Sequence, residues 1–514
     1  MLAPYDIAII GGGINGCGIA RDAAGRGHTV YLCEMNDLAS GTSSWSTKLI
    51  HGGLRYLEYG EFRLVRESLL EREVLWQLAP HLIHPLRFIL PHHDGLRPKW
   101  LLRLGLFIYD HLGGRRLLPA TRTINLQSGA LGEPLTKGRF TTGFEYSDCL
   151  VDDARLVVAN AHAAASLGAV IETRTLAQSA RRADGQWELT VTTAGMDAQR
   201  TIKARTLVNA GGPWADLVLR DCANLKSKSH VRLVQGSHIV VPALFAHGHA
   251  YIFQNRDGRV IFAIPYESRF TLIGTTDCDY AGDPAAVAAT ADDIDYLCTA
   301  VSDYFEKPVR PADVVWAYSG VRPLYNDGAS EAKATTREYV FELDAPEAEA
   351  PLLSIFGGTI TTYRRLAESA LEKLAPFLPP KSVKTSGWTA TSPLPGGNMP
   401  VNGGPALVKD LMRRYPFLVE PHAERLAMAY GTLAGRVLNG AKTITDLGEQ
   451  FGGTLTEAEV VYLMTAEWAR TADDVVWRRS KLGLSMSTGE IARLSAWMVD
   501  QRPAVVASEK ADQK

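Results

Sequence analysis

The chain has 514 residues, a length that predicts two or three lobes sharing an interior rather than one small domain. Its composition, 46% hydrophobic and 21% charged, is ordinary for a folded globular protein and excludes general disorder. The formal net charge of -2 gives no reason to expect a polyanion as partner, so no nucleic-acid binding is predicted.

No targeting or membrane-spanning segment is expected. The first residues run directly into a strand without the basic segment, apolar run and cleavage site of a signal peptide. The longest apolar stretch outside the core strands, residues 100–109, is interrupted by Arg103 and is far shorter than the roughly 20 residues that span a bilayer. Six scattered cysteines without a C-x-x-C pair favour a reducing cytosol and predict neither disulfides nor a metal site.

The N-terminal segment alternates between strand and helix. Residues 6–10 are predicted as an apolar strand, 11–16 as a tight glycine turn, 17–26 as a helix and 29–33 as a second apolar strand. This order predicts a βαβ unit that opens a parallel sheet. A longer helix with one apolar side is expected at residues 62–79.

Later strands are expected to return to this sheet. They are predicted at residues 170–175, 187–191, 205–209 and 352–356, the last followed by a helix at 361–374. Between them, residues 231–273 alternate apolar and polar side chains, which predicts an antiparallel sheet. The nucleotide fold is therefore expected to come from three separated pieces, with a mostly antiparallel domain inserted between them.

A joint rich in Pro, Gly and Ser marks a further boundary. It covers residues 376–380 and 392–405. Beyond it the chain is predicted to be helical, at residues 406–414, 423–430, 457–471 and 488–499.

A glycine motif, Gly11-x-Gly13-x-x-Gly16, lies between the first strand and the first helix. Gly11 permits the tight turn, Gly13 lets backbone approach a pyrophosphate, and Gly16 allows close packing of helix on sheet. Glu34 ends the second strand, where a carboxylate can accept hydrogen bonds from ribose hydroxyls. The motif predicts a dinucleotide site, but it does not by itself separate FAD from NAD.

A hydroxyl-rich loop follows Glu34, where an NAD enzyme would usually continue with further βα units. The loop contains Thr42, Ser43 and Ser44, whose small hydroxyl side chains can donate to phosphates. Paired glycines further on, Gly52 and Gly53, permit a flat ring to lie against backbone. The alternative is an ordinary Ser/Thr loop, but its neighbours favour FAD.

Distinctive runs recur along nearly the whole chain. They lie at residues 10–16, 48–57, 144–148, 151–155, 236–239, 273–277, 318–323, 356–358 with 361–364, and 472–474 with 477–479. Together they resemble the FAD-dependent, respiratory glycerol 3-phosphate dehydrogenases, within the wider group of D-amino-acid-oxidase-like flavoproteins. The runs at 48–57 and 318–323 are specific to that family rather than to flavoproteins at large.

The resemblance implies a fold, a reaction and a location. The fold is an α/β Rossmann-type FAD-binding domain with an inserted antiparallel α+β substrate cap domain and a C-terminal all-α domain. The implied boundaries are 1–90, 145–225 and 350–376 for FAD binding, 91–144 and 226–349 for the cap, and 390–505 for the helical domain. The reaction is oxidation of glycerol 3-phosphate to dihydroxyacetone phosphate, with electrons passed to FAD and then to a membrane quinone. The protein is expected in the cytoplasm, peripherally on the inner face of the membrane, and a homodimer is left open.

The FAD site is expected to combine the glycine turn, the hydroxyl-rich loop and the Phe-Gly-Gly run. The predicted cofactor-binding residues are Gly11, Gly13, Asn15, Gly16, Glu34, Thr42, Ser43, Ser44, His51, Gly357, Gly358 and Thr359. No clear attachment residue is seen, so FAD is expected to be held without a covalent bond.

Two arginines are the candidate substrate-binding and catalytic groups. Arg55 and Arg322 lie within family runs, and by resemblance both point into the pocket with Tyr56 beside them. Their guanidinium forks suit phosphate or hydroxyl oxygens. The alternative for each is a surface arginine.

The proton acceptor has two candidates. His238 is favoured, because a histidine can take and release a proton near neutral pH. His51 is the second, although its place beside the flavin loop suits ring contact better. A structural histidine is the alternative for His238.

One position departs from the family. A lysine directly after Phe-Gly-Gly, close to the flavin C2 carbonyl, is replaced here by Thr359. Charge stabilisation of reduced flavin would then fall to the dipole of the helix that follows, worth roughly 0.3–1 kcal/mol. This leaves a related polyol phosphate, such as an erythritol phosphate, as an alternative substrate. An amino-acid oxidase and a flavin-binding protein without turnover are further alternatives.

Residues 96–114 combine basic and apolar side chains. The basic residues in and just after this stretch are Arg97, Lys99, Arg103, Arg115 and Arg116, and the apolar ones include Trp100, Leu101, Leu104, Leu106, Phe107 and Tyr109. Such a stretch can lie in a bilayer interface, and the alternative is a helix packed on the cap. A quinone acceptor favours the interface.

Overall fold

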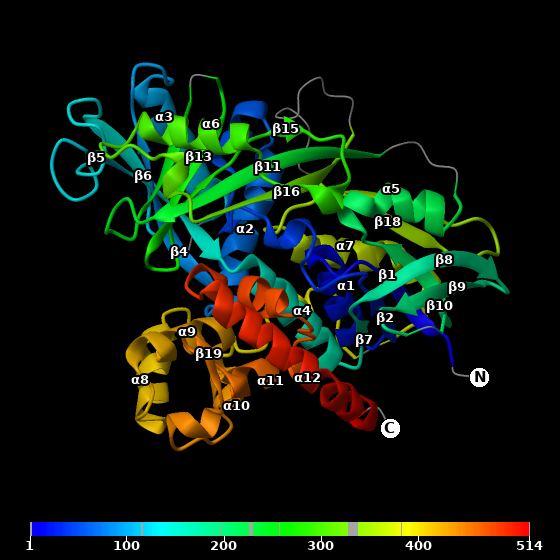
Figure 1. The fold of residues 1–514 in the computed structure, drawn as a ribbon. Helices are drawn as coiled ribbons and strands as arrows, with labels where there is room; N and C mark the ends of the chain where they lie inside the picture. Colours follow the sequence, from blue (N-terminus) through cyan, green and yellow to red (C-terminus); the bar gives the residue numbers. More distant parts are fainter. Residues whose placement is uncertain are drawn as a thin grey trace.

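The protein folds into two large β-sheets and a C-terminal set of helices (Figure 1). This computed structural model describes residues 3–114, 117–196, 198–225, 230–255, 257–326, 338–381 and 383–512. Arg115 and Arg116, counted above among the basic residues, therefore lie outside the described residues.

The first sheet contains the N-terminal βαβ unit. Its main path is β17 (Val340–Asp344), β18 (Leu352–Phe356), β10 (Arg200–Asn209), β1 (Tyr5–Ile10), β2 (Val30–Cys33) and β7 (Val170–Glu172). The strands from β18 to β7 are parallel, and β17 is antiparallel at the edge. A hairpin of β8 (Thr175–Ala183) and β9 (Gln186–Thr193) pairs with β10.

Helices cover one face of this sheet. They are α1 (Ile14–Gly25), α4 (Asp153–Ser166) and α7 (Tyr363–Leu374). β1 is a nearly continuous apolar run because it is covered on both faces, as parallel strands usually are. The helix predicted at residues 17–26 begins earlier, at Ile14, since Gly13 already serves as its N-cap.

The second sheet is mostly antiparallel. Its main path is β15 (Cys278–Asp279), β11 (Val231–Pro242), β14 (Phe270–Gly274), β13 (Val260–Tyr266), β12 (Ala250–Gln254), β4 (Ile83–Pro91), β6 (Thr142–Val151) and β3 (Leu49–Ile50), with β16 (Trp316–Tyr325) beside β11 and β5 (Arg122–Asn125) beside β6. One pair, β4 with β12, is parallel, at the place where β4 from an earlier piece of the chain joins the later antiparallel strands. Around it lie α2 (Phe62–Leu78), α3 (Lys99–Leu112) and α6 (Ala291–Ser302).

The C-terminal helices have a hydrophobic core of their own. They are α8 (Gly404–Arg414), α9 (Glu420–Tyr430), α10 (Ala434–Leu438), α11 (Glu457–Ala466) and α12 (Thr488–Asp512). The expectation of an all-α unit is wrong in one detail, because β19 (Gln450–Gly452) and β20 (Leu455–Thr456) form a small hairpin. We call residues 404–512 the helical unit.

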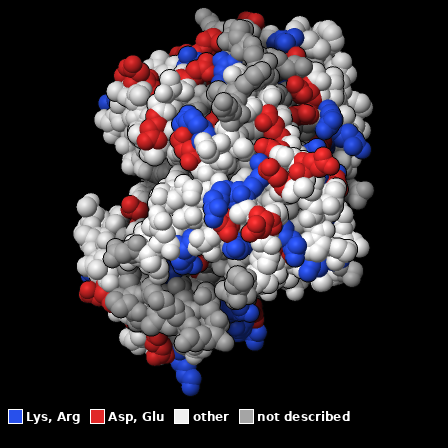
Figure 2. All heavy atoms as spheres, turned by 90° about the vertical axis from the view of Figure 1, so that its right-hand side faces the viewer, with Lys and Arg blue, Asp and Glu red and all other residues white. Residues whose placement is uncertain are grey.

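Charges of both signs are interspersed on the face drawn in Figure 2, in keeping with the small net charge. All six cysteines are free thiols. Within the described ranges, no helix is both long and apolar enough to cross a membrane.

Candidate active site

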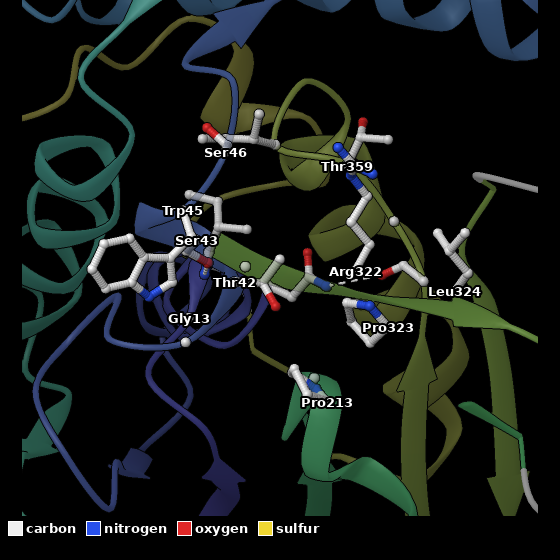
Figure 3. A pocket seen from close by; sticks show the side chains of 18 of the residues that line it. Gly13, Thr42, Ser43, Trp45, Ser46, Pro213, Arg322, Pro323, Leu324 and Thr359 are labelled. Carbon is white, nitrogen blue, oxygen red and sulfur yellow. Dashed lines mark hydrogen bonds between the residues drawn. The ribbon is translucent and has the colours of Figure 1, made fainter. Parts of the chain in front are cut away.

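A cavity of about 390 Å³ is bounded by loops from both sheets. Its wall includes the glycine turn after β1, the loop after β2, the end of β16 and the turn after β18. Figure 3 shows side chains from these separate elements around the same space, with Thr42 and Ser43 from one segment and Arg322 and Thr359 from others. The ends of the parallel strands therefore face a site that the second sheet closes.

The glycine turn shapes one end of the cavity. Gly11 has a φ of +114°, and a Cβ there would lie 2.4 Å from the Ala210 carbonyl oxygen. Gly13 lines the cavity, where a Cβ would approach the Ser43 hydroxyl at 3.3 Å. Gly16 lies inside α1, and a Cβ would meet the Gly11 carbonyl oxygen at 2.0 Å, so its role is close helix–strand packing. This is a cradle of backbone that a pyrophosphate can approach.

Glu34 stands at the same end. Its carboxylate accepts hydrogen bonds from the backbone N–H groups of Gly12 (2.7 Å) and Asn36 (2.8 Å). Burial raises its pKa, while these two N–H donors lower it. The carboxylate is thus held at the end of β2 and lines the cavity, as a ribose-binding group must.

The hydroxyl-rich loop contributes only part of what was expected. The Ser43 hydroxyl accepts from the Ile14 N–H at 3.0 Å, at the first turn of α1, and lines the cavity. Thr42 also lines it but donates its own hydroxyl proton to the Val321 carbonyl at 2.6 Å. Ser44 is not among the residues that line the cavity, because the 3₁₀ helix Thr42–Ser44 turns its side chain away.

The turn after β18 forms the opposite wall. Gly357 and Gly358 have φ values of +72° and +88°, which place their backbone against the cavity without a side chain. Asn15 donates to the Gly357 carbonyl at 3.5 Å, and its own amide oxygen is buried without a hydrogen-bond partner among the described residues. Glycine backbone, an open amide oxygen and a held carboxylate fit a flavin dinucleotide.

Arg322 reaches the cavity from β16. Its guanidinium donates to the Thr275 hydroxyl at 3.1 Å and to the Asp277 carboxylate, both in the segment after β14. Gly236 on the neighbouring strand makes room, because a Cβ there would lie 2.7 Å from the Arg322 Nη2 atom. Both partners line the cavity beside the arginine, so the fork is held in a fixed direction within it.

Arg55, Tyr56 and His51 also line the cavity. Arg55 and Tyr56 lie in a 3₁₀ helix, Leu54–Tyr59. Gly53, just before this helix, has a left-handed backbone conformation. The His51 N–H donates to the Thr361 hydroxyl at 3.2 Å, which ties this segment to the turn before α7.

His238 lies one layer behind the cavity. It is on the same face of β11 as Gly236, but two residues further along, where Thr47 covers it. Its Nε2 atom is 3.0 Å from the Thr47 hydroxyl, and its ring stacks on Tyr318 with centroids 4.8 Å apart. Burial lowers its pKa well below the usual value, and the charges of Arg322 and Lys48 lower it further. The imidazole is therefore neutral, and the hydroxyl of Thr47 links it to the cavity.

Thr359 lines the cavity and stabilises the turn before α7. Its hydroxyl lies 3.0 Å from that of Thr362 and accepts from the Thr362 N–H at 3.3 Å. The helix expected from residue 361 begins at Tyr363, after this turn.

Most of the predicted site residues thus share one cavity. Those that line it are Gly11, Gly13, Asn15, Glu34, Thr42, Ser43, His51, Arg55, Tyr56, Arg322, Gly357, Gly358 and Thr359. Gly16, Ser44 and His238 do not. The prediction missed Trp45, Trp214, Thr275 and Asp277, which line it too. Thr275 and Asp277 lie in a family run, so that run held the signal.

Comparison with known proteins extends over nearly the whole chain. Residues 6–343 match the family described as FAD dependent oxidoreductase, and residues 388–496 match the C-terminal domain of alpha-glycerophosphate oxidase. A glycerol-3-phosphate dehydrogenase of Pseudomonas aeruginosa is 51% identical, over 97% of this chain and 96% of its own. A D-erythritol 1-phosphate dehydrogenase of Brucella abortus is 50% identical, over 96% and 97%. The solved structure of a glycerol-3-phosphate dehydrogenase from Bacillus halodurans complexed with FAD has a TM-score of 0.74 and 28% identity, covering 97% of this chain and 90% of that one.

Proposed function

The chain belongs to the family of FAD-dependent oxidoreductases, and from that premise we propose that it oxidises glycerol 3-phosphate to dihydroxyacetone phosphate and passes the electrons to a membrane quinone. The observation that carries the substrate class is Arg322, a fixed guanidinium on the wall of the cavity that also holds the dinucleotide-binding turn. Similarity to proteins named glycerol-3-phosphate dehydrogenase supports the same conclusion.

The residues of the chain divide the work. Bound FAD supplies the hydride acceptor for alcohol oxidation. Arg322 and Arg55 bind the phosphate and orient the alcohol, with Tyr56 beside them. His238, acting through the Thr47 hydroxyl, takes the proton of the alcohol, and His51 on the cavity wall is the competing acceptor.

We assign the two ligands, FAD and the substrate, to two sets of residue ranges. We assign FAD binding to residues 1–90, 145–225 and 350–376, which supply the glycine turns and every strand of the first sheet except β17. Residues 91–144 and 226–349 act as the substrate cap, because they supply Arg322 and its two partners.

Anaerobic mixing with glycerol 3-phosphate tests the proposal. We expect rapid bleaching of the flavin absorbance, because a productive substrate reduces the cofactor when no acceptor is present. D-erythritol 1-phosphate is the second candidate, favoured by Thr359 and by the similarity to the Brucella abortus protein. If D-erythritol 1-phosphate bleaches the flavin faster, it replaces glycerol 3-phosphate as the proposed substrate. If neither compound bleaches the flavin, the proposal of a polyol-phosphate dehydrogenase is contradicted.

Replacing Thr359 by lysine should raise the reduction potential of the flavin. A positive charge on the cavity wall stabilises the electron-rich reduced ring more than the oxidised one. At an effective dielectric near 20 the effect is about 1–3 kcal/mol, or roughly 20–65 mV for a two-electron couple. A potentiometric titration of both proteins measures it.

Thr359→Met is the matched control, since it is similar in length to lysine without the charge. An equal shift in both variants, or no shift in Thr359→Lys, would remove the electrostatic argument. Turnover of both phosphates by each variant shows whether the position also selects between them.

A peripheral membrane position is supported by α3. Trp100, Leu104 and Phe107 lie on one stripe of this helix and are 69%, 47% and 52% exposed, while Leu106 and Tyr109 on the other side are buried. Exposed aromatic and aliphatic side chains at i, i+4 and i+7 beside basic residues are typical of a helix lying in a bilayer interface. We assign this stripe to the cytoplasmic face of the membrane, where the quinone is reached.

Changing Trp100 and Phe107 together to glutamine should weaken binding to phospholipid vesicles by about thirty- to a hundred-and-fiftyfold, because each half-inserted ring contributes roughly 1–1.5 kcal/mol. Co-sedimentation with vesicles measures the change. Met428→Gln, on the exposed side of α9, is the control and should bind as wild type does. Unchanged binding of the double variant would contradict the assignment of this stripe.

A further inference from the structure

The loop after β2 has an inner stretch that faces away from the cavity. Glu34, Met35 and residues 40–43 line the cavity, whereas Asp37 between them does not. The Asp37 side chain is fully buried. A buried carboxylate in the middle of a ligand-binding loop needs a charged partner.

That partner belongs to the helical unit. Arg479 donates both terminal nitrogens to the two oxygens of Asp37, at 2.8 and 2.9 Å, and is itself fully buried. Arg478 adds a third bond, from Nε to Asp37 at 2.6 Å. The two arginines end a short helical turn, Asp474–Arg479, that lies 442 residues beyond the loop in the sequence.

The turn that carries these arginines is fixed in its own right. Arg479 also donates to the Glu467 carbonyl at 2.6 Å. Asp474, whose pKa burial would raise, is held at a pKa of about 2 by Arg478, Arg174 and Arg479. The Arg174 guanidinium donates to the Asp474 carboxylate at 2.7 Å, and the Arg174 backbone N–H donates to the Asn36 carbonyl at 2.8 Å. The loop is therefore gripped at two adjacent residues, Asn36 and Asp37.

Backbone hydrogen bonds connect the loop after β2 to the glycine turn of the cofactor site. From Asp37 the loop continues through Ala39, whose N–H donates to the Gly12 carbonyl at 3.1 Å inside the glycine turn. Glu34 bonds the same glycine from the other side. Among the described residues, none from the helical unit lines the cavity, and this loop gives that unit a direct backbone connection to the glycine turn.

We propose that the helical unit holds the loop after β2 in the conformation that binds FAD. Arg479 is the positioning residue, and it acts through its ion pair with Asp37. The proposal rests on FAD as cofactor and is independent of which alcohol is oxidised. Without the fork, the loop must be ordered when FAD binds, and that cost appears as weaker binding.

The test compares FAD affinity with global stability in four holoenzymes. They are wild type, Asp37→Asn, Arg479→Lys and the control Glu459→Gln. Glu459 is fully buried and pairs with Arg425 at 2.6 Å entirely within the helical unit. FAD release on dilution is followed by flavin fluorescence, well below the melting temperature of each protein, and melting is followed by circular dichroism.

We expect Asp37→Asn to weaken FAD binding by about tenfold or more, because it removes a charge-assisted fork. Arg479→Lys keeps the charge but loses the fork, so its effect should be smaller in the same direction. Glu459→Gln should lower the melting temperature while FAD affinity stays within about twofold. At saturating FAD, kcat/KM of Asp37→Asn should return to the wild-type value.

Three results would overturn the proposal. One is wild-type FAD affinity in Asp37→Asn; another is a loss in Glu459→Gln as large as that in Asp37→Asn. The third is a kcat/KM that excess FAD does not restore. If Asp37→Asn does not fold, Arg478→Gln leaves the Arg479 fork in place and removes the third bond to Asp37 together with the ion pair between Arg478 and Asp474. We expect about a threefold loss of FAD affinity from it, and no loss would contradict the grip.

Discussion

Replacing Arg322 by alanine should lower kcat/KM for a phosphorylated polyol by about ten- to a hundredfold, and for the unphosphorylated polyol far less. A charge-assisted contact of this kind contributes about 1.5–3 kcal/mol. The variant also removes the cation that faces Asp277, so the carboxylate and the phosphate then repel each other across the cavity. Steady-state kinetics with both substrates measure the difference.

Arg232→Ala is the matched control. Arg232 lies on β11 and donates to Asp279 at 2.7 and 2.8 Å, a pair that resembles Arg322 with Asp277 but does not line the cavity. It should leave the ratio of the two kcat/KM values unchanged. Equal losses for both substrates in Arg322→Ala would mean that Arg322 is structural or contacts only the flavin.

Gly16→Ala should leave the purified protein largely without FAD. The new Cβ would overlap the Gly11 carbonyl oxygen at 2.0 Å, and because this contact is with backbone there is little room to yield. Either α1 moves away from β1 or the glycine turn opens, and both remove the N–H donors from the diphosphate. Overpacking of this kind costs about 1–3 kcal/mol in stability. The ratio of flavin to protein absorbance and the melting temperature report the two effects.

Gly105→Ala is the control, because Gly105 also lies within a helix but alanine there should stabilise the protein. Gly105 lies within α3, and a Cβ there meets nothing within 4 Å. Alanine should therefore stabilise this helix by about 0.5–1 kcal/mol and leave FAD content unchanged. A full complement of FAD in Gly16→Ala would show that the helix can shift without loss of the site.

Local patterns predicted the first unit of the fold well. The strand, turn, helix and strand from residue 5 to residue 33 depend on neighbours in sequence, and only the start of the helix was misplaced by more than one residue. The hairpin β19–β20 was missed because its strands have three and two residues, too few for a period to show.

Contacts between distant residues could not be read in this way. Arg322 was predicted to enter the pocket, but its partners Thr275 and Asp277 come from the segment after β14, more than forty residues earlier in the sequence. His238 was predicted as the proton acceptor from its place after Gly236. Thr47, which lies between His238 and the cavity, comes from a loop nearly two hundred residues earlier in the sequence. Ser44 shared a hydroxyl-rich run with Thr42 and Ser43, and the 3₁₀ turn separated it from them.

The order of strands in the first sheet has a consequence for how the protein is made. β1 pairs with β10, and β10 pairs with β18, so the centre of the sheet joins residues near 10, 205 and 355. Long loops must close before these pairs contribute stability, which makes such topologies slow to form. The glycine turns that follow the three strands complete the cavity only when all three are in place. A chain still emerging from the ribosome therefore holds no finished flavin site until β18 has been synthesised, so FAD binding at this site follows the synthesis of residue 358.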